Sequence, residues 1–366
     1  SGATRNAAGF AGDVLLAGGT VLGGVLNIAD ADAFNFSSST SNAFDGVMVN
    51  GDVILDGANS AVQLRNGSTV SGMIELAGNG SRLLLNGSQT LSSDVVSTAT
   101  FSSVSVEADG TVATIGAGTT ISGPRIDIGS AFVAGGDRSL VNEGAIIADG
   151  ANTTGVRLLS LANLTNSGVF AATNGGQIAV FSSVADFTNL ENGVLTGGVY
   201  RVGAGSRMNL GGDIVTNAAA IELLGAGAQF DGLERLARNE GELAIAADAQ
   251  FALSGDLEFA AMSTFTVLVT GTGDLINVPL LDVAGAATLE GRLVLDFTGY
   301  SSSTEGVFRF LDAESFAGDW SSIDILGIDA GLVSFNAGPG TFNLVPSPGS
   351  RGLLLAAGLV ATRRRR

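Results

Sequence analysis

One segment of the chain repeats itself after twenty residues, and this repeat constrains the fold more than any other feature. Residues 54–71 align with residues 74–91, matching Ile54 with Ile74, Asn59 with Asn79, Leu64 with Leu84, and Asn66-Gly67-Ser68 with Asn86-Gly87-Ser88. Twenty residues of alternating strand pattern with Asn-Gly turns correspond to about one coil of a β-solenoid. The repeat therefore predicts an all-β chain whose main part is a right-handed parallel β-helix, with coils stacked about 4.8 Å apart. An antiparallel β-sandwich, which also uses short strands and tight turns, is the alternative.

A looser form of the repeat continues along the chain. Its phrases are Leu140-Val-Asn142-Glu-Gly144, Leu164-Thr-Asn166-Ser-Gly168, Leu190-Glu-Asn192-Gly193 and Leu236-Ala-Arg-Asn239-Glu-Gly241. Asparagines that recur once per coil can stack and satisfy one another's side-chain amides. Because no segment shows the three-to-four spacing of a long amphipathic helix, the solenoid pattern is expected to extend to about residue 262.

The amino-acid composition narrows the classes of function. The chain has no cysteine and no histidine, and all seventeen of its basic residues are arginines. The commonest general base, the thiolate metal ligands and lysine chemistry are therefore missing, which weighs against an enzyme. The net charge of −18 argues against nucleic acid or anionic lipid as a partner. An acidic surface of this kind suits a cation-rich extracellular setting.

The pattern of apolar and aromatic residues changes at about residue 263. Longer alternating runs follow, and they hold many of the aromatic side chains, including Phe265, Phe297 and Trp320. We expect residues 263–344 to form a β-rich cap, because an uncovered terminal coil would be a template for aggregation. The phrase from Leu281 to Gly291 is similar to the closing module of secreted bacterial β-solenoid and autotransporter-like passenger proteins, in which such a module caps the rod.

Few residues are candidates for chemistry. Asp30 and Asp32, in a D-x-D phrase, are the candidate calcium ligands, with solvated turn residues as the alternative reading. No catalytic or cofactor-binding residue is assigned, and calcium is the one cofactor considered. The enzymatic alternative is a calcium-dependent β-helix polysaccharide lyase, because such lyases share the fold. In it an arginine would have to act as the base, from the set Arg65, Arg82, Arg125 and Arg157.

The last twenty-two residues, 345–366, form a distinct tail. Pro346, Ser347 and Pro348 make an extended Pro-x-Pro element, and an apolar run over residues 352–362 follows it. The run is shorter than the roughly 20 residues that span a bilayer. It ends in four arginines, which would face the cytoplasm. These are Arg363, Arg364, Arg365 and Arg366.

This order of elements resembles the tails of bacterial PEP-CTERM proteins, although Ser347 replaces the central glutamate of that signature. The resemblance implies a partner, a membrane-embedded exosortase that removes the tail after transient membrane contact. It also implies a secretion signal upstream of Ser1. The expected function is a secreted structural or adhesive protein of the cell surface or extracellular matrix, with extracellular polysaccharide as a further partner. The lyase is the alternative.

Overall fold

The computed structural model describes residues 4–6, 13–129, 136–151, 154–181, 185–246, 248–302, 304–335 and 339–345. Strands dominate, and they pair mainly in parallel to form a β-solenoid of about eleven turns. The predicted parallel β-helix is therefore confirmed. The chain divides into two compact units, one formed by Ser1–Ile214 with Ala228–Leu233 and the other by Val215–Gly227 with Glu234–Arg366.

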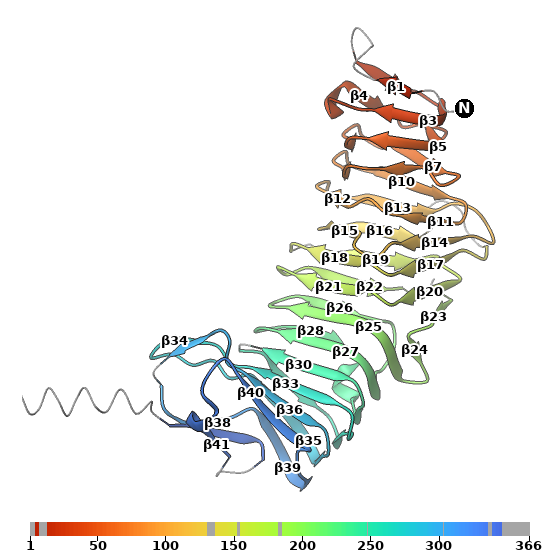
Figure 1. The fold of residues 1–366 in the computed structure, drawn as a ribbon. Coiled ribbons are helices and arrows are strands. Elements are labelled where there is room, and N and C mark those ends of the chain that lie inside the picture. The colour runs from red at the N-terminus through yellow and green to blue at the C-terminus, as the bar shows by residue number, and fades with distance from the viewer. Residues whose placement is uncertain are drawn as a thin grey trace, which may run out of the picture. The chain divides into compact units, whose positions relative to one another are not determined.

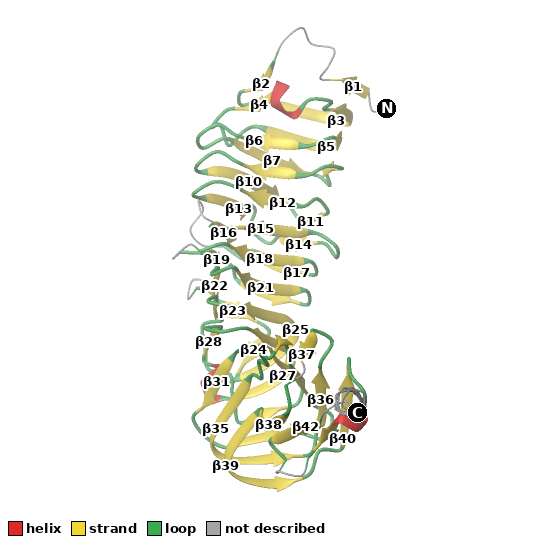
Figure 2. Cartoon of the chain, turned by 90° about the vertical axis from the view of Figure 1, so that its left-hand side faces the viewer, coloured by secondary structure: helices red, strands yellow, loops and turns green. Residues whose placement is uncertain are grey.

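Three parallel ladders build the first unit, and each ladder gains at most one strand per coil (Figures 1 and 2). The first ladder is β1 (Thr4–Asn6), β3 (Thr20–Asn27), β5 (Ala43–Asn50), β7 (Ala61–Arg65), β10 (Ser81–Asn86), β13 (Ser102–Val106), β16 (Ile126–Gly129), β19 (Val156–Leu159), β22 (Gln177–Val180), β26 (Arg207–Asn209) and β28 (Gln229–Asp231). The second is β6 (Val53–Leu55), β9 (Ile74–Leu76), β12 (Val95–Ser97), β15 (Thr120–Gly123), β18 (Ala145–Asp149), β21 (Val169–Thr173) and β25 (Val194–Gly203). The third is β11 (Gln89–Leu91), β14 (Val112–Ile115), β17 (Ser139–Asn142), β20 (Asn163–Asn166) and β23 (Asp186–Phe187). Further short elements are β2 (Val14–Leu16), which pairs with β4 (Phe34–Phe36), β8 (Thr69–Val70), β24 (Leu190–Glu191) and the 3-10 helix η2 (Ala31–Ala33).

The core of the first unit is a set of apolar columns that run from coil to coil. One column stacks Val62, Leu83, Val104, Ile128, Leu158 and Val180 in direct register. Every member of this column is buried. Burying one such side chain stabilises the fold by roughly 1.5–3 kcal/mol, so each added coil extends the core while pairing its backbone with the coil before it.

The register of the repeat differs by one residue from the sequence alignment. Ile74 lies beside Val53, and Leu85 lies beside Leu64, so the coils are offset by 74 − 53 = 85 − 64 = 21 residues. The predicted match of Ile54 with Ile74 is therefore wrong, since Ile74 is fully buried and Ile54 is half-exposed on the opposite face of its strand. The twenty-residue identity matches Asn66 with Asn86, but Asn66 lies in the turn after β7 with a φ of 50°, whereas Asn86 is the last residue of β10 and pairs with Arg65.

Two parallel ladders continue the solenoid pattern in the second unit. The first is β27 (Thr216–Leu224), β30 (Glu242–Ala246), β33 (Thr264–Leu268), β36 (Arg292–Asp296) and β40 (Ser322–Leu326). The second is the start of β27, then β29 (Arg238–Asn239), β32 (Leu257–Phe259), β35 (Leu280–Leu289) and β39 (Leu311–Gly318), with β31 (Gln250–Leu253) also beside β35. A separate pair joins β34 (Gly271–Gly273) to β37 (Tyr300–Ser302), and the remaining helices are η3 (Leu233–Arg235) and η4 (Ala330–Leu332).

An antiparallel sheet lies at the end of the chain's described part. It consists of β38 (Gly306–Arg309), β42 (Thr341–Leu344) and β41 (Val333–Ser334). Phe342 on β42 is fully buried and packs against Phe297, Phe308 and Phe310 at centroid distances of 5.5–6.2 Å. Parallel pairing nevertheless continues through β40, well past the boundary expected at residue 262. Among the described strands of this unit, β38, β41 and β42 form the antiparallel strand pairs.

Candidate functional site

Buried asparagines join successive coils of the first unit. The side chain of Asn142 donates to Asn166 Oδ1 at 2.7 Å. Asn189 Oδ1 accepts the backbone N–H of Asn166 at 2.6 Å, and Asn189 Nδ2 donates to the Asn166 carbonyl at 2.8 Å. None of the three residues is more than 5 % exposed. The ladder expected for Asn142 and Asn166 is confirmed.

The third rung of this ladder is not the residue that the repeat phrases indicate. Register places Phe187 beside Leu164, so Asn189 occupies the position assigned to Asn192. Asn192 instead lies exposed in a tight turn with a φ of 52°. The signal was present in the sequence, since Phe187-Thr188-Asn189 repeats the Leu-Thr-Asn phrase with an aromatic residue in place of leucine.

The glycines of the repeat phrases permit close stacking of the backbone. A Cβ on Gly168 would lie 2.0 Å from the carbonyl oxygen of Gly144, and one on Gly144 would lie 2.2 Å from that of Thr119. In the second unit Gly241 is equally confined, and Asn217 donates to Asn239 at 2.7 Å. These residues serve the contact between successive coils.

Corner aspartates also bind the next coil. Asp52 accepts the N–H of Met73 at 2.8 Å, Asp94 that of Thr120 at 2.7 Å, and Asp256 that of Ala286 at 2.8 Å. A carboxylate that accepts a backbone amide forms a strong, charge-assisted hydrogen bond. Three of the chain's 35 acidic residues are thus used at the corners of the coils.

The calcium candidates lie at one turn of the first unit. Asp30 caps η2, where its Oδ1 accepts the N–H of Asp32 at 3.2 Å, and the Asp32 carbonyl accepts from Asn35 Nδ2 at 3.2 Å. Across the described ranges no group of three or more acidic side chains is arranged to hold a metal ion. Calcium needs six to eight oxygen ligands, so this turn by itself offers an incomplete set.

The arginines of the lyase alternative are distributed along the first ladder. Arg82 and Arg157 are three register steps apart, through Ser103 and Asp127, which corresponds to about 14 Å. Arg157 forms a two-pronged ion pair with Asp127, whose side chain is only 8 % exposed. The Arg157 guanidinium is thus engaged by the Asp127 carboxylate.

The remaining two arginines of that set have separate partners. Arg125 lies over the ring of Phe101, 5.0 Å from its centroid, and Arg65 Nε donates to Gln63 Oε1 at 2.8 Å. The structure therefore does not bring the four arginines together.

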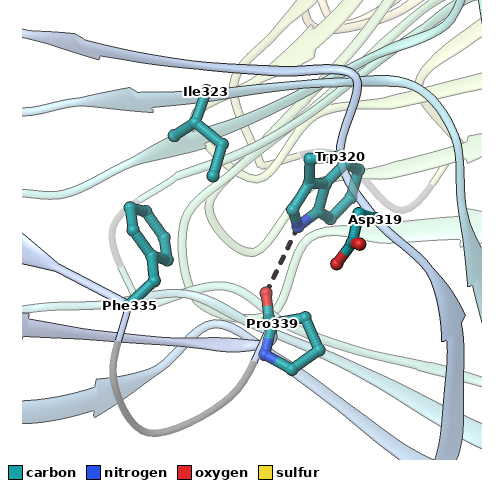
Figure 3. Close-up of a pocket in the computed structure, with 5 residues that line it drawn as sticks. All are labelled: Asp319, Trp320, Ile323, Phe335 and Pro339. Carbon is teal, nitrogen blue, oxygen red and sulfur yellow. Dashed lines mark hydrogen bonds between the residues drawn. The ribbon is translucent and has the colours of Figure 1, made fainter.

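A pocket of about 400 Å³ lies in the second unit. Its lining residues, which define the Trp320 pocket, are Asp319, Trp320, Ile323, Phe335 and Pro339 (Figure 3). Asp319 and Trp320 occupy the turn between β39 and β40, and Ile323 lies on β40. Phe335 follows β41, and Pro339 precedes β42. The pocket thus forms where the last parallel coil meets the antiparallel sheet.

Trp320 is held firmly on one side of the pocket. Its ring lies 5.0 Å from that of Phe259 and 6.1 Å from that of Phe265, both fully buried. Its Nε1–H donates to the carbonyl of Pro339 at 3.2 Å, as the dashed line in Figure 3 marks. With one side packed and its donor satisfied, the indole offers mainly its π surface to the pocket.

Ile323 explains why the pocket is apolar. It continues the buried column of Leu243, Phe265 and Leu293, yet its side chain is 39 % exposed. The column therefore ends at the Trp320 pocket. Phe265 and Phe297, two aromatic residues of the expected cap, are fully buried, whereas Trp320 has both a core side and an open side.

Comparison with known proteins gives no relative, because no protein family, curated protein or solved structure matches the chain significantly. The sorting residues Pro346, Ser347, Pro348 and Arg363–Arg366 lie outside the described residues. Within the described part, none of the helices has the length and apolar character needed to cross a membrane.

Proposed function

We propose that the chain is a secreted structural or adhesive protein of a bacterial cell surface or extracellular matrix. In this proposal the β-solenoid is the mature body, and the tail of residues 345–366 is a sorting signal for an exosortase. Extracellular polysaccharide is the proposed matrix partner, and membrane contact is transient, through the tail.

One observation carries the structural part of the proposal. The repeated polar residues are engaged in holding coil to coil, as Asn142, Asn166 and Asn189 do in the core and Asp52 and Asp94 do at the corners. A body built in this way resists local opening, because each internal strand of a ladder is paired on both sides. Such a body suits a scaffold that displays a surface.

The sorting part of the proposal rests on the tail sequence, and it is tested in the source bacterium. We expect the intact chain to reach the cell exterior, where protease added to whole cells reaches it. Replacing Arg363–Arg366 with serines removes the positive stop and should leave the chain unprocessed. Equal processing and equal surface exposure of both forms would refute a sorting role for the tail.

The lyase alternative is separated by a direct assay. Uronide release from acidic polysaccharides is measured with the purified chain in the presence of calcium. The structural proposal predicts no release above the blank, and steady release that Arg157→Lys abolishes would replace it with the lyase.

A further inference from the structure

The Trp320 pocket combines an apolar surface with one negatively charged side chain, and the packing of the second unit does not explain this combination. Its described lining residues form aromatic and aliphatic walls, and among these described residues only Asp319 carries a charge, on its carboxylate. Asp319 is exposed, and among the described residues no cationic side chain forms an ion pair with it. Figure 3 shows Ile323 and Phe335 across the cavity from Trp320, with Asp319 beside the indole.

The apolar walls and the Asp319 carboxylate together favour a ligand that carries a positive charge. A phosphate, sulfate or carboxylate would meet the carboxylate of Asp319 with no basic group to offset the repulsion. A calcium ion would find one carboxylate where it needs six to eight oxygens. A positively charged organic group fits both parts of the pocket, because aromatic faces attract cations and a carboxylate pairs with them.

The size of the pocket selects a small ligand. Its volume of about 400 Å³ lies within the roughly 300–1,000 Å³ of sites that hold small molecules. The walls formed by Trp320, Ile323 and Phe335 favour a ligand whose cation is attached to an apolar surface.

We propose that the Trp320 pocket binds a small organic cation, with an ammonium group at Asp319 and an apolar face against Trp320. The two sources of this chemistry are a free alkylammonium compound and the protonated amine of an amino sugar. This binding is independent of whether the tail is cleaved, so its failure and the failure of the sorting proposal are distinguishable.

The chain carries its own probe for this test. Trp320 is the one tryptophan in the sequence, so intrinsic fluorescence of the whole chain reports on the pocket. Glucosamine and choline are titrated into the purified protein at low salt. N-acetylglucosamine and glucose serve as uncharged counterparts of the amino sugar. The proposal predicts a saturable fluorescence change with at least one cation and none with the uncharged sugars, and the two cations distinguish the sources.

Two variants with the same change of charge make the test specific. Asp319→Asn removes the charge at the pocket, and it should weaken the apparent affinity about three- to fivefold, as loss of an exposed charge contact does. Glu314→Gln removes an exposed charge on β39 that does not line the pocket, and it should leave the affinity within about twofold. Phe335→Leu keeps the apolar volume and removes a ring, so it should weaken binding without touching the charge.

Three results would overturn the proposal. One is a fluorescence change that does not saturate with either cation. Another is equal binding of glucosamine and N-acetylglucosamine, which would indicate an uncharged sugar site. The third is an equal loss of affinity in Asp319→Asn and Glu314→Gln, which would indicate only general attraction of cations to an acidic protein.

Discussion

Replacing Asn189 by alanine tests the asparagine ladder directly. The Asn189 side chain makes three hydrogen bonds, to the N–H of Asn166 at 2.6 Å, to the Asn166 carbonyl at 2.8 Å and to the Thr196 carbonyl at 2.6 Å. Each bond contributes about 1 kcal/mol, and a buried N–H left without a partner costs about 1–3 kcal/mol. Loss of the donor costs less free energy at the two carbonyl oxygens, because each oxygen has a second lone pair that can accept a hydrogen bond. We therefore expect Asn189→Ala to lower the free energy of unfolding by about 3–5 kcal/mol.

The matched control lies three residues away. Asn192 is exposed and has a φ of 52°, which glycine adopts without strain. Asn192→Gly should therefore change stability by no more than about 0.5 kcal/mol. The two variants separate a buried rung from a turn residue of the same type.

The assay combines thermal unfolding, followed by far-UV circular dichroism, with amide hydrogen exchange. For a unit of this size, 3–5 kcal/mol corresponds to a fall in Tm of about 6–20 °C. Amide hydrogen exchange should accelerate first in β20, which contains Asn166, and in β21, the next strand along the chain. Equal Tm values for Asn189→Ala and Asn192→Gly, or unchanged exchange in β20, would refute the reasoning.

Three further predictions follow from the register, the stacking and the buried phenol. Gly168→Ala should lower the free energy of unfolding by about 1–3 kcal/mol in a denaturant titration, because its Cβ would lie 2.0 Å from the Gly144 oxygen. Gly255→Ala is the control, since there is open space around Gly255. Equal denaturation midpoints for the two variants would contradict the close approach at Gly168. Ile74→Asp should prevent folding, since Ile74 is fully buried, whereas Ile54→Asp should cost at most about 1 kcal/mol; soluble, folded protein from both would refute the 21-residue register. Burial raises the pKa of Tyr200 above the ordinary value of 10.0, so the stability present below pH 10 should fall as pH rises further, by up to about 1.4 kcal/mol per pH unit. Tyr200→Phe should remove that part of the alkaline loss, and parallel pH profiles for the two proteins would contradict it.

The sequence alone was enough to predict the class of fold. Asn-Gly turns and short alternating runs predicted a parallel β-solenoid, and the recurring Asn142 and Asn166 predicted a ladder that the structure contains. Both signals arise from local backbone chemistry, because left-handed turns select glycine and asparagine and stacked amides select asparagine. Local chemistry is what a sequence reports most directly.

The pairing register of the strands could not be predicted from the sequence pattern. Residues twenty apart lie on opposite faces of their strands when the coil repeats after 21 residues, so identical letters at Ile54 and Ile74 do not mean equivalent positions. The third rung is Asn189 because Phe187 replaces the leucine of the phrase and pairs with Leu164.

The Trp320 pocket could not have been predicted from the sequence. Its residues come from the β39–β40 turn, β40 and the segments next to β41 and β42, and only the folded chain brings them together. Trp320 itself was recognised as an aromatic of the cap, but its open side depends on the apolar column ending at Ile323. The position at which a buried column ends depends on the tertiary structure, and no local sequence pattern indicates it.

The mass of the mature C-terminus, taken from protein isolated from the source bacterium, is the most direct test of the proposed surface function. The proposal predicts a chain that ends upstream of the apolar run, near Pro346–Pro348, and that lacks Arg363–Arg366. Such a chain would also lack Arg351, so the loss of five arginines would take the net charge from −18 to −18 − 5 = −23. Mature protein whose last residues are still Arg363–Arg366 would contradict it.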